Sequence, residues 1–399
     1  MTNEEIIKKI EEYNTNEKKT IALFCDVFYP SIDGVISVVN NLAIVLSEHY
    51  NVVVCVPKHK KETVFRKEYL VIGAKSFKVP GMNYECSLNP AKDKEFMKYL
   101  SMLKIDLIHF HSPFFMGKFA AKYAKKNNIP LVATIHSKYK QDFWMSTHSH
   151  ILTNILTRNI VKVFNKADQI ITMNKYCEKT FRAYKVTPPI TLIGNGTNYR
   201  APEVINTATI RAELGIKSQN MLLFVGRLVK VKNLPLTLKI MSILKQKGID
   251  FCFVCAGEGS QLKKLKRLSK KYNIENNVIF LGKIASIEKL SQIYASADLF
   301  VFNSTYDTEG LVILEAAATG TPSVVVENSG PACRIVNNEN GFTSSNNPNE
   351  FANRIEELLK NKELIAATGE KAKQTLPKSW KDTCKDYVKF YNKLLKEPN

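Results

Sequence analysis

The sequence predicts an α/β protein built from two doubly wound, parallel-sheet domains, and three observations lead to this prediction. Short apolar runs rich in β-branched residues alternate with longer amphipathic stretches; the alternation stops over residues 196–219; and it then restarts and continues to residue 328. Buried strands that alternate with helices form a parallel sheet with helices on both faces. Each half of the chain is therefore expected to fold as a Rossmann-like domain.

In the first half, short apolar runs are the expected strands, and amphipathic stretches such as 35–49 and 118–127 are the expected helices. The runs cover residues 20–27, 51–57, 105–110, 130–136, 168–174 and 190–195. We assign residues 1–200 to this N-terminal domain.

The second half repeats the pattern after a polar linker, residues 196–219, which contains Pro202 and lacks a strand-like run. The further apolar runs cover residues 221–228, 249–257, 277–283, 297–304 and 322–328. We assign residues 201–378 to a C-terminal domain. The amphipathic pattern of residues 379–399 predicts one terminal helix.

The chain has 399 residues and a net charge of +20. Such a surplus is typical of proteins with a polyanionic partner, which can be nucleic acid, an anionic membrane or a phosphorylated substrate; coding bias is the alternative. Residues 1–200 hold 29 basic and 17 acidic residues, and the remainder holds 28 and 20, so no single basic tail accounts for the charge. Because the chain shows no recognition module and no interleaving of aromatic and basic residues, no nucleic-acid partner is expected.

No run approaches the roughly 18 uninterrupted apolar residues of a membrane-spanning helix, and the charged N-terminal segment does not match a signal peptide. We therefore expect a cytoplasmic protein. Among the cysteines, Cys25, Cys55, Cys252 and Cys255 lie in apolar, strand-like runs. Cys252 and Cys255 are three residues apart on one strand and would point to opposite faces, so we expect buried apolar side chains and no metal site.

Ligands of parallel sheets bind beyond the carboxyl ends of the strands, so polar residues at those ends are the first candidates for a site. Arg227 and Lys232 follow the strand expected over 221–226, and two cations in front of a helix N-terminus suit a diphosphate. Gly257 follows the next strand in a Gly-Glu-Gly turn, where the backbone can approach a ligand closely. The alternatives are a solvated basic turn and an ordinary tight turn.

Two carboxylates, Asp307 and Glu315, follow the strand expected over 298–303, and Gly310 lies between them. Ionised carboxylates only accept hydrogen bonds and therefore suit the hydroxyls of a sugar or a ribose. The alternative for Glu315 is electrostatic stabilisation of a helix N-terminus.

Three histidines lie at strand ends in the first half: His109 and His111 in the segment HFHSP, and His136 after the next strand. One histidine alone is usually structural, but three near the carboxyl edge of one sheet favour a binding site. His109 is still in strand register with His111 and is expected to pack deeper on the same face. Gly34 opens the helix that follows the first strand.

Together these segments resemble the family 4 glycosyltransferases, retaining enzymes of the GT-B fold, in which two Rossmann-like domains face a central cleft. The resemblance covers about residues 20–395 and includes the order of the elements. The segments that carry the resemblance are, in chain order, the DGV loop after the first strand, HxHSP, TxHS, the NG of residues 195–196, GRLxxxKN, AGEG, FLGK and LEAAATGTP. In this arrangement we expect residues 379–399 to pack back on the N-terminal domain.

The resemblance implies that the C-terminal domain binds a nucleotide-sugar donor. Arg227 and Lys232 would hold the diphosphate and Glu315 the ribose hydroxyls. Asp307 stands where the family usually has a glutamate that faces the transferred sugar; it is one methylene shorter, and Glu309 is a candidate substitute at a different spacing. The remaining implied donor contacts are Gly257, the backbone at Gly310 and Leu311, and Lys283 and Ile284 beside the base.

In the N-terminal domain, the resemblance implies that Gly34 leaves room for the donor phosphate and the acceptor, and that His111 contacts the transferred sugar near the reacting carbon. His136, Ser137 and Tyr139 would border the acceptor. The implied catalytic residues are His111, Asp307, Arg227 and Lys232.

The family is generally thought to use a front-face route, in which the leaving phosphate helps to deprotonate the acceptor. No strand-end carboxylate of the first domain fits the nucleophile of a double displacement, and no Asp-x-Asp metal-binding pair occurs in the chain. We therefore expect transfer from a UDP- or GDP-hexose without metal or other cofactor, Arg227 and Lys232 stabilising the leaving diphosphate. The expected acceptor is a lipid-linked sugar, a glycolipid or a cell-surface polysaccharide.

Two other functions stay open at this point. One is a nucleotide-sugar epimerase or soluble-acceptor transferase on the same fold, and the other is a non-catalytic nucleotide-sugar-binding subunit, which Asp307 would favour. An anionic membrane surface is a further candidate partner, because residues 143–164 combine Trp144 and aliphatic side chains with Arg158 and Lys162. The alternative is a helix whose apolar side faces the core and whose basic side faces water.

Overall fold

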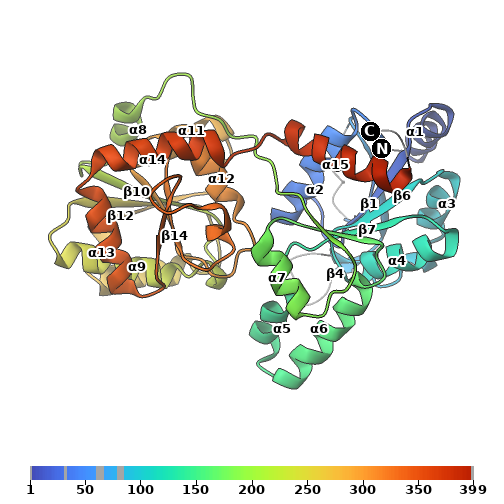
Figure 1. Ribbon diagram of the computed structural model, residues 1–399, viewed down its shortest axis with the longest axis horizontal. Helices are drawn as coiled ribbons and strands as arrows, with labels where there is room; N and C mark the ends of the chain where they lie inside the picture. Colours follow the sequence, from blue (N-terminus) through green and yellow to red (C-terminus); the bar gives the residue numbers. More distant parts are fainter. Residues whose placement is uncertain (1, 31–33, 60–66, 79–84, 397–399) are drawn as a thin grey trace. The chain divides into compact units, whose positions relative to one another are not determined.

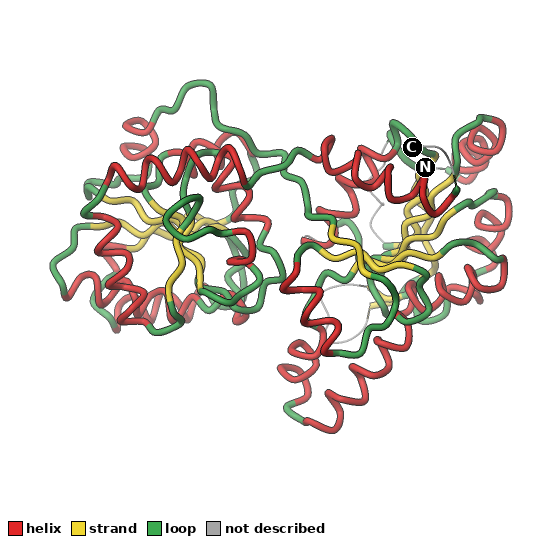
Figure 2. The backbone as a smooth tube through the Cα atoms, in the orientation of Figure 1, coloured by secondary structure: helices red, strands yellow, loops and turns green. Residues whose placement is uncertain are grey.

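The structure, a computed structural model, describes residues 2–30, 34–59, 67–78 and 85–396, so Asp33 of the DGV loop lies outside the described residues. The chain divides into two compact units (Figure 1). The first unit holds Met1–Asn195 and Trp380–Asn399, and the second holds Gly196–Ser379. Each unit has a parallel sheet between helices (Figure 2), which confirms the predicted fold class.

The sheet of the first unit has the strand order β3-β2-β1-β6-β7-β8-β9, and all of its neighbours are parallel. The strands are β1 (Thr20–Phe24), β2 (Asn51–Lys58), β3 (Leu70–Lys75), β6 (Leu107–Phe110), β7 (Leu131–Thr134), β8 (Gln169–Thr172) and β9 (Ile190–Leu192). A short antiparallel pair, β4 (Phe77–Lys78) and β5 (Glu85–Cys86), follows β3. Strand β3 was not predicted; it is an edge strand in which buried residues alternate with half-buried or exposed ones.

The helices of the first unit are α1 (Asn3–Thr15), α2 (Gly34–Leu46), α3 (Lys94–Met102), α4 (Phe115–Asn127), α5 (Tyr139–Thr147), α6 (His150–Phe164), α7 (Lys175–Ala183) and α15 (Trp380–Leu395). Helix α15 comes from the end of the chain and packs against α2. The hydroxyl of Tyr50 donates to Oδ1 of Asn392 at 2.7 Å, and Tyr387 and Tyr391 of α15 are buried. The terminal helix is therefore part of the core of the first unit.

The sheet of the second unit has the strand order β12-β11-β10-β13-β14-β15. Its strands are β10 (Asn220–Val225), β11 (Phe251–Ala256), β12 (Val278–Gly282), β13 (Leu299–Phe302), β14 (Ser323–Val326) and β15 (Phe342–Ser344). Its helices are α8 (Thr207–Glu213), α9 (Leu234–Gln246), α10 (Leu262–Lys271), α11 (Ile287–Ala295), α12 (Leu311–Ala318), α13 (Pro348–Leu359) and α14 (Lys362–Thr375).

Strand adjacency decides which loops meet. In the second unit β10 lies between β11 and β13, so the loops after these three strands share one edge of the sheet. In the first unit β6 lies between β1 and β7 in the same way. The four cysteines expected in strand-like runs are buried, as predicted. No helix among the described residues has the length and apolar character needed to cross a membrane.

Candidate active site

In the second unit, Lys232 and Asp307 meet beyond the carboxyl ends of the adjacent strands β10 and β13. Lys232 ends the short 3-10 turn Lys230–Lys232, and its Nζ lies 2.5 Å from Oδ1 of Asp307. Nζ also lies 5.2 Å from the centre of the Phe302 ring, whose face attracts a cation. The side chains of the ion pair are only 14% and 16% exposed, so salt screens it weakly. The sequence indicated both residues but not that they pair.

This ion pair leaves one hydrogen-bond acceptor unused. In the described part of the chain, Oδ2 of Asp307 is buried and has no hydrogen-bond partner. An unpartnered buried carboxylate oxygen costs free energy, and a ligand that donates a hydrogen bond would remove that cost. A sugar hydroxyl is such a donor.

Ser304, which the sequence analysis missed, connects the loop of Asp307 to the turn of Lys232. Its hydroxyl donates to the backbone oxygen of Val231 at 3.2 Å and accepts from the N–H groups of Tyr306 and Asp307, at 3.3 and 3.4 Å. Ser304 is completely buried. Its position two residues after β13 was the only signal for this role in the sequence.

Helix α12 begins directly after this loop. Gly310 caps it with a φ of +77°, and a Cβ there would lie 3.4 Å from the Phe302 ring, so glycine is favoured. Leu311 is the first helical residue, and the unpaired N–H groups of a helix start suit a phosphate oxygen. Glu309, the candidate substitute for the family's glutamate, is buried and pairs with Arg334 at 2.8 Å.

The other expected donor-side residues follow neighbouring strands. Arg227 is exposed after β10, and Lys283 and Ile284, exposed and half-buried, follow β12. Gly257 has a φ of +142°, and a Cβ there would collide with the carbonyl oxygen of Gly226. This glycine therefore lets the turns after β10 and β11 touch, which is a structural requirement that holds without any ligand.

Glu315 lies one turn inside α12 and faces Tyr294 of α11. The Tyr294 hydroxyl donates to Oε2 at 2.9 Å, and the Tyr199 ring packs edge-on against that of Tyr294. Burial disfavours the ionised carboxylate and raises the pKa of Glu315 to about 7, although the Tyr294 hydrogen bond acts in the opposite direction. Burial thus brings the pKa of Glu315 close to neutral pH, which no sequence pattern indicated.

Glu315→Gln is expected to change how stability depends on pH. The pKa of this carboxyl is about 7 when folded and near 4.5 when exposed in the unfolded chain. Between these values the folded protein binds more protons than the unfolded chain, so the free energy of unfolding falls as pH rises. Glutamine does not ionise, so the Glu315→Gln variant does not lose stability in this way. Its Tm should therefore fall less between pH 4.5 and 8 than that of the wild type, whereas exposed Glu339→Gln should follow the wild type. If Tm changed with pH in the same way in the wild type and in both variants, this prediction would be wrong.

In the first unit, His109, His111 and His136 form one buried cluster at the ends of β6 and β7. Nδ1 of His111 and Nε2 of His136 share a hydrogen bond of 3.0 Å, and the rings of His109 and His111 have centres 4.1 Å apart. Burial lowers the pKa of all three, that of His136 to about 4, so they are neutral at pH 7. Within the described residues, Nε2 of His111 is buried without a hydrogen-bond partner and is the open polar atom of the cluster.

Asp26, to which the sequence analysis gave no role, holds the loop after His111. It lies two residues beyond β1, and its carboxylate accepts hydrogen bonds from the Ser112 hydroxyl at 2.6 Å and from the N–H groups of Phe114 and Met116 at 3.2 and 2.8 Å. Burial nevertheless raises the pKa of Asp26. Because these bonds occupy both oxygens, the carboxylate fixes the start of α4 and is not open to a sugar.

The other expected residues of the first unit differ in their surroundings. Gly34 starts α2, and a Cβ there would meet no described atom within 4 Å, so the space in front of it is open. Ser137 is half-buried. Tyr139 is 6% exposed, and its ring packs against Phe114 and Phe164 with centres 5.7 and 5.9 Å apart. The structure thus places Tyr139 in the core.

Two family models match the chain, one for each half. Glycosyltransferase Family 4 matches residues 32–200, and Glycosyl transferases group 1 matches residues 206–375. The chain belongs to the family 4 glycosyltransferases. The predicted family is therefore confirmed, and the protein is a glycosyltransferase.

Similar proteins agree with this assignment. The glycosyltransferase is 25% identical over 319 residues to alpha-monoglucosyldiacylglycerol synthase of Streptococcus pneumoniae, covering 76% of this chain and 70% of that protein. It is 26% identical over 361 residues to the Acholeplasma laidlawii enzyme of the same name, covering 85% and 86%. HepE of Anabaena, solved in complex with UDP, superposes with a TM-score of 0.76 at 17% identity, over 94% of this chain and 100% of that one. The last similarity concerns the fold, which is GT-B.

Proposed function

We propose that this glycosyltransferase moves a hexose from a nucleoside-diphosphate hexose to a glycolipid or lipid-linked acceptor and retains the anomeric configuration. UDP is the favoured nucleotide because HepE was solved with UDP, and GDP is the alternative. A lipid acceptor is supported by the two relatives named as synthases of monoglucosyldiacylglycerol, a glycolipid.

In the proposed front-face reaction, the bond between the anomeric carbon and the diphosphate breaks on the same face where the acceptor oxygen bonds. The acceptor proton passes to an oxygen of the leaving diphosphate. Arg227 and Lys232 supply positive charge for that leaving group, which is commonly the largest contribution to such catalysis. His111 and Asp307 would bind hydroxyls of the transferred sugar. In this scheme neither a metal nor a protein nucleophile takes part.

One observation carries the proposal: Lys232 and Asp307 place a cation beside an unpartnered carboxylate oxygen, just before the start of α12. The cation suits a diphosphate and the free oxygen suits a hydroxyl, so one cluster matches both parts of a nucleotide sugar. A nucleotide that carried no sugar would leave the carboxylate oxygen unpartnered. The cluster therefore favours a sugar nucleotide over a simple nucleotide.

The test is product analysis with defined donors and acceptors. The protein is incubated with UDP-glucose, UDP-galactose or GDP-mannose, with and without vesicles of diacylglycerol or monoglucosyldiacylglycerol. We expect a new glycolipid whose sugar keeps the α-configuration of the donor, measured from the anomeric proton coupling. A β-linked product would contradict retention. Conversion of the donor without acceptor product would indicate an epimerase or hydrolase, and binding without turnover of any donor would indicate a non-catalytic subunit.

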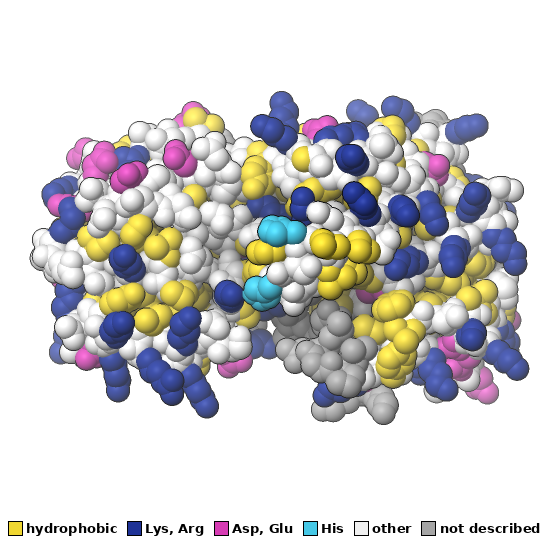
Figure 3. All heavy atoms as spheres, turned by 90° about the horizontal axis from the view of Figure 1, so that it is seen from below, with side chains coloured by type: hydrophobic (Ala, Val, Ile, Leu, Met, Phe, Trp, Pro, Cys, Tyr) yellow, Lys and Arg dark blue, Asp and Glu magenta, His cyan; other side chains and the backbone are white. Residues whose placement is uncertain are grey.

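We further propose that the α5–α6 hairpin binds an anionic membrane, at the cytoplasmic face. Four of the eleven exposed large hydrophobic side chains in the described chain lie on it: Trp144, Ile151, Leu152 and Ile155. Arg158 and Lys162 continue the row of Ile151 and Ile155 along α6 at helical spacing. Figure 3 shows hydrophobic side chains beside Lys and Arg side chains on the face that the hairpin presents. An apolar tip followed by basic residues suits a surface of anionic lipids.

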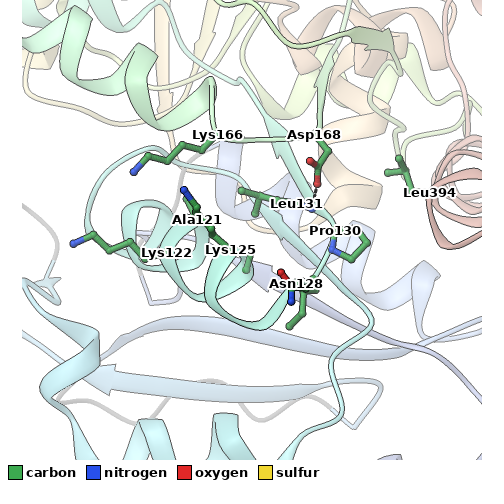
Figure 4. Close-up of a pocket in the computed structure, with 11 residues that line it drawn as sticks. Ala121, Lys122, Lys125, Asn128, Pro130, Leu131, Lys166, Asp168 and Leu394 are labelled. Atoms are coloured by element: carbon green, nitrogen blue, oxygen red, sulfur yellow. Dashed lines mark hydrogen bonds between the residues drawn. The ribbon is translucent and has the colours of Figure 1, made fainter.

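A basic cavity adjoins the end of the same helix. Figure 4 shows Lys122 and Lys125 of α4 and Lys166, which follows α6, around it. Asp168 accepts a hydrogen bond from the N–H of Leu131 at 2.7 Å, at the start of β7. The cavity thus lies at the opposite end of β7 from the histidine cluster. Its lysines would add to the attraction of lipid phosphates and not to donor binding.

Arg158→Glu/Lys162→Glu is expected to weaken co-sedimentation with vesicles that contain anionic lipid by about tenfold or more, since each basic residue near such a surface contributes about 1 kcal/mol. The matched control is Arg267→Glu/Lys271→Glu on α10, an exposed pair of the same types at the same spacing, on a helix without exposed large hydrophobic side chains. An equal loss in both variants would indicate a general charge effect. Equal recovery of the wild type with neutral and anionic vesicles would contradict membrane binding.

A further inference from the structure

A hydrogen-bonded chain connects the terminal helix to the histidine cluster. Tyr391 of α15 is completely buried, and its hydroxyl lies 2.6 Å from Nδ1 of His109. Nε2 of His109 lies 2.7 Å from Oγ1 of Thr134, at the end of β7. Two hydroxyls thus occupy both ring nitrogens of His109, whereas His111 keeps an open Nε2. Both ring nitrogens of His109 are therefore occupied, so His109 cannot bind a ligand itself. Its ring packs on the ring of His111, whose Nε2 is open.

One of the two hydroxyls must donate a hydrogen bond to His109 and the other must accept one, because a neutral imidazole has one N–H and one nitrogen lone pair. A phenol is a stronger hydrogen-bond donor than an aliphatic alcohol. The Tyr391 hydroxyl therefore donates to Nδ1 of His109, and the Thr134 hydroxyl accepts from Nε2. Burial raises the pKa of Tyr391, so its hydroxyl keeps its proton. His109 is then the tautomer with hydrogen on Nε2.

We infer that Tyr391 is a positioning residue for sugar transfer: it fixes the tautomer and orientation of His109, and the fixed ring holds His111 with Nε2 open to the substrate. The inference rests on the proposed function, in which His111 contacts the transferred sugar. The rings of His109 and His111 are in direct contact, with an angle of 33° between them. A charge on one ring would repel a charge on the other, and burial lowers the pKa of both, so neither ring is charged at pH 7.

His111 is held from its other side as well, because its Nδ1 hydrogen-bonds to His136. The titratable groups packed around the cluster come from three elements. Tyr387 and Tyr391 lie on α15, and His136 follows β7. Asp26 follows β1 and bonds to Ser112, the residue after His111. Of these groups, Tyr391 is the one whose side chain hydrogen-bonds to His109, and it lies 282 residues further along the chain. The terminal helix is thus part of the support of the site.

The test is Tyr391→Phe, which keeps the ring and removes the hydroxyl. We expect kcat to fall about tenfold, because a misplaced contact to the reacting sugar lowers the rate, with the KM for the donor nearly unchanged. The acid limb of the kcat profile should move to higher pH, since His109 loses the donor that favours its neutral form. The matched control is Tyr50→Phe, which removes another buried hydroxyl bond to α15, to Asn392 at 2.7 Å, without contacting the histidines through that hydroxyl.

Two further measurements separate the outcomes. If His111→Ala turns over like the wild type, the proposed role of His111 fails. If His111→Ala is inactive and Tyr391→Phe has the kcat and pH profile of Tyr50→Phe, only the inference on Tyr391 fails. If Tyr391→Phe does not fold, long-range ¹H–¹⁵N spectra of the wild type decide, with the His109 signals assigned from His109→Gln. Hydrogen on Nδ1 of His109 would overturn the inference.

Discussion

Lys232→Ala is expected to lower kcat/KM for the sugar nucleotide by about 10² to 10³, a loss typical of removing one preorganised group that stabilises developing charge. Two contacts disappear together. The diphosphate loses a cation, and Asp307 loses the partner that lies 2.5 Å from its carboxylate. The remaining carboxylate then stands largely buried without an opposite charge, which also disfavours the phosphate nearby. Steady-state kinetics with the donor varied measure the effect, and thermal unfolding shows whether the fold is kept.

Lys230→Ala is the matched control for this experiment. Lys230 begins the same short turn but is exposed, so its removal should leave kcat/KM within a factor of about two of the wild type. Asp307→Asn tests the other partner, because it removes the negative charge at nearly constant shape. We expect it to impair transfer more than binding of free UDP. A Lys232→Ala enzyme with wild-type kcat/KM would mean that the diphosphate binds elsewhere.

His111→Ala is expected to lower kcat by about 10- to 100-fold, the range of one hydrogen bond to a buried polar group. Nε2 of His111 is the open polar atom of the histidine cluster, and a sugar hydroxyl would be its partner. If this contact is stronger in the transition state, kcat and kcat/KM fall together while KM changes little. His49→Ala removes an exposed histidine of the same unit and should be neutral. Unchanged turnover in His111→Ala would remove the histidine cluster from the mechanism.

The central strands could be predicted from the sequence because both of their faces are buried. Strands β10 and β11 are buried at every position, which makes them continuous apolar runs. The missed strands lie at sheet edges. In β3, buried residues alternate with half-buried or exposed ones, and β15 has three residues and pairs only with β14. An edge strand needs fewer apolar residues, and its signal is correspondingly weaker.

The candidate site was predictable as a set of positions but not as a set of contacts. Lys232, Asp307 and His111 were found because ligands of parallel sheets bind at strand ends. Their partners depend on which strands are neighbours and on side-chain conformation. The bond between Lys232 and Asp307 joins residues 75 positions apart, and that between His109 and Tyr391 spans 282. Asp26 did have a signal, since it is a lone carboxylate two residues after a buried strand.

The first unit is made of two separate stretches of chain, with the whole second unit between them. Domains fold as they leave the ribosome, in the order of their synthesis. Here the unit that begins first is completed last, because α2 and His109 stay uncovered until residues 380–395 emerge. By then the second unit has its full sequence. A chain interrupted before residue 380 would therefore contain all residues of the second unit but would lack the helix that covers His109.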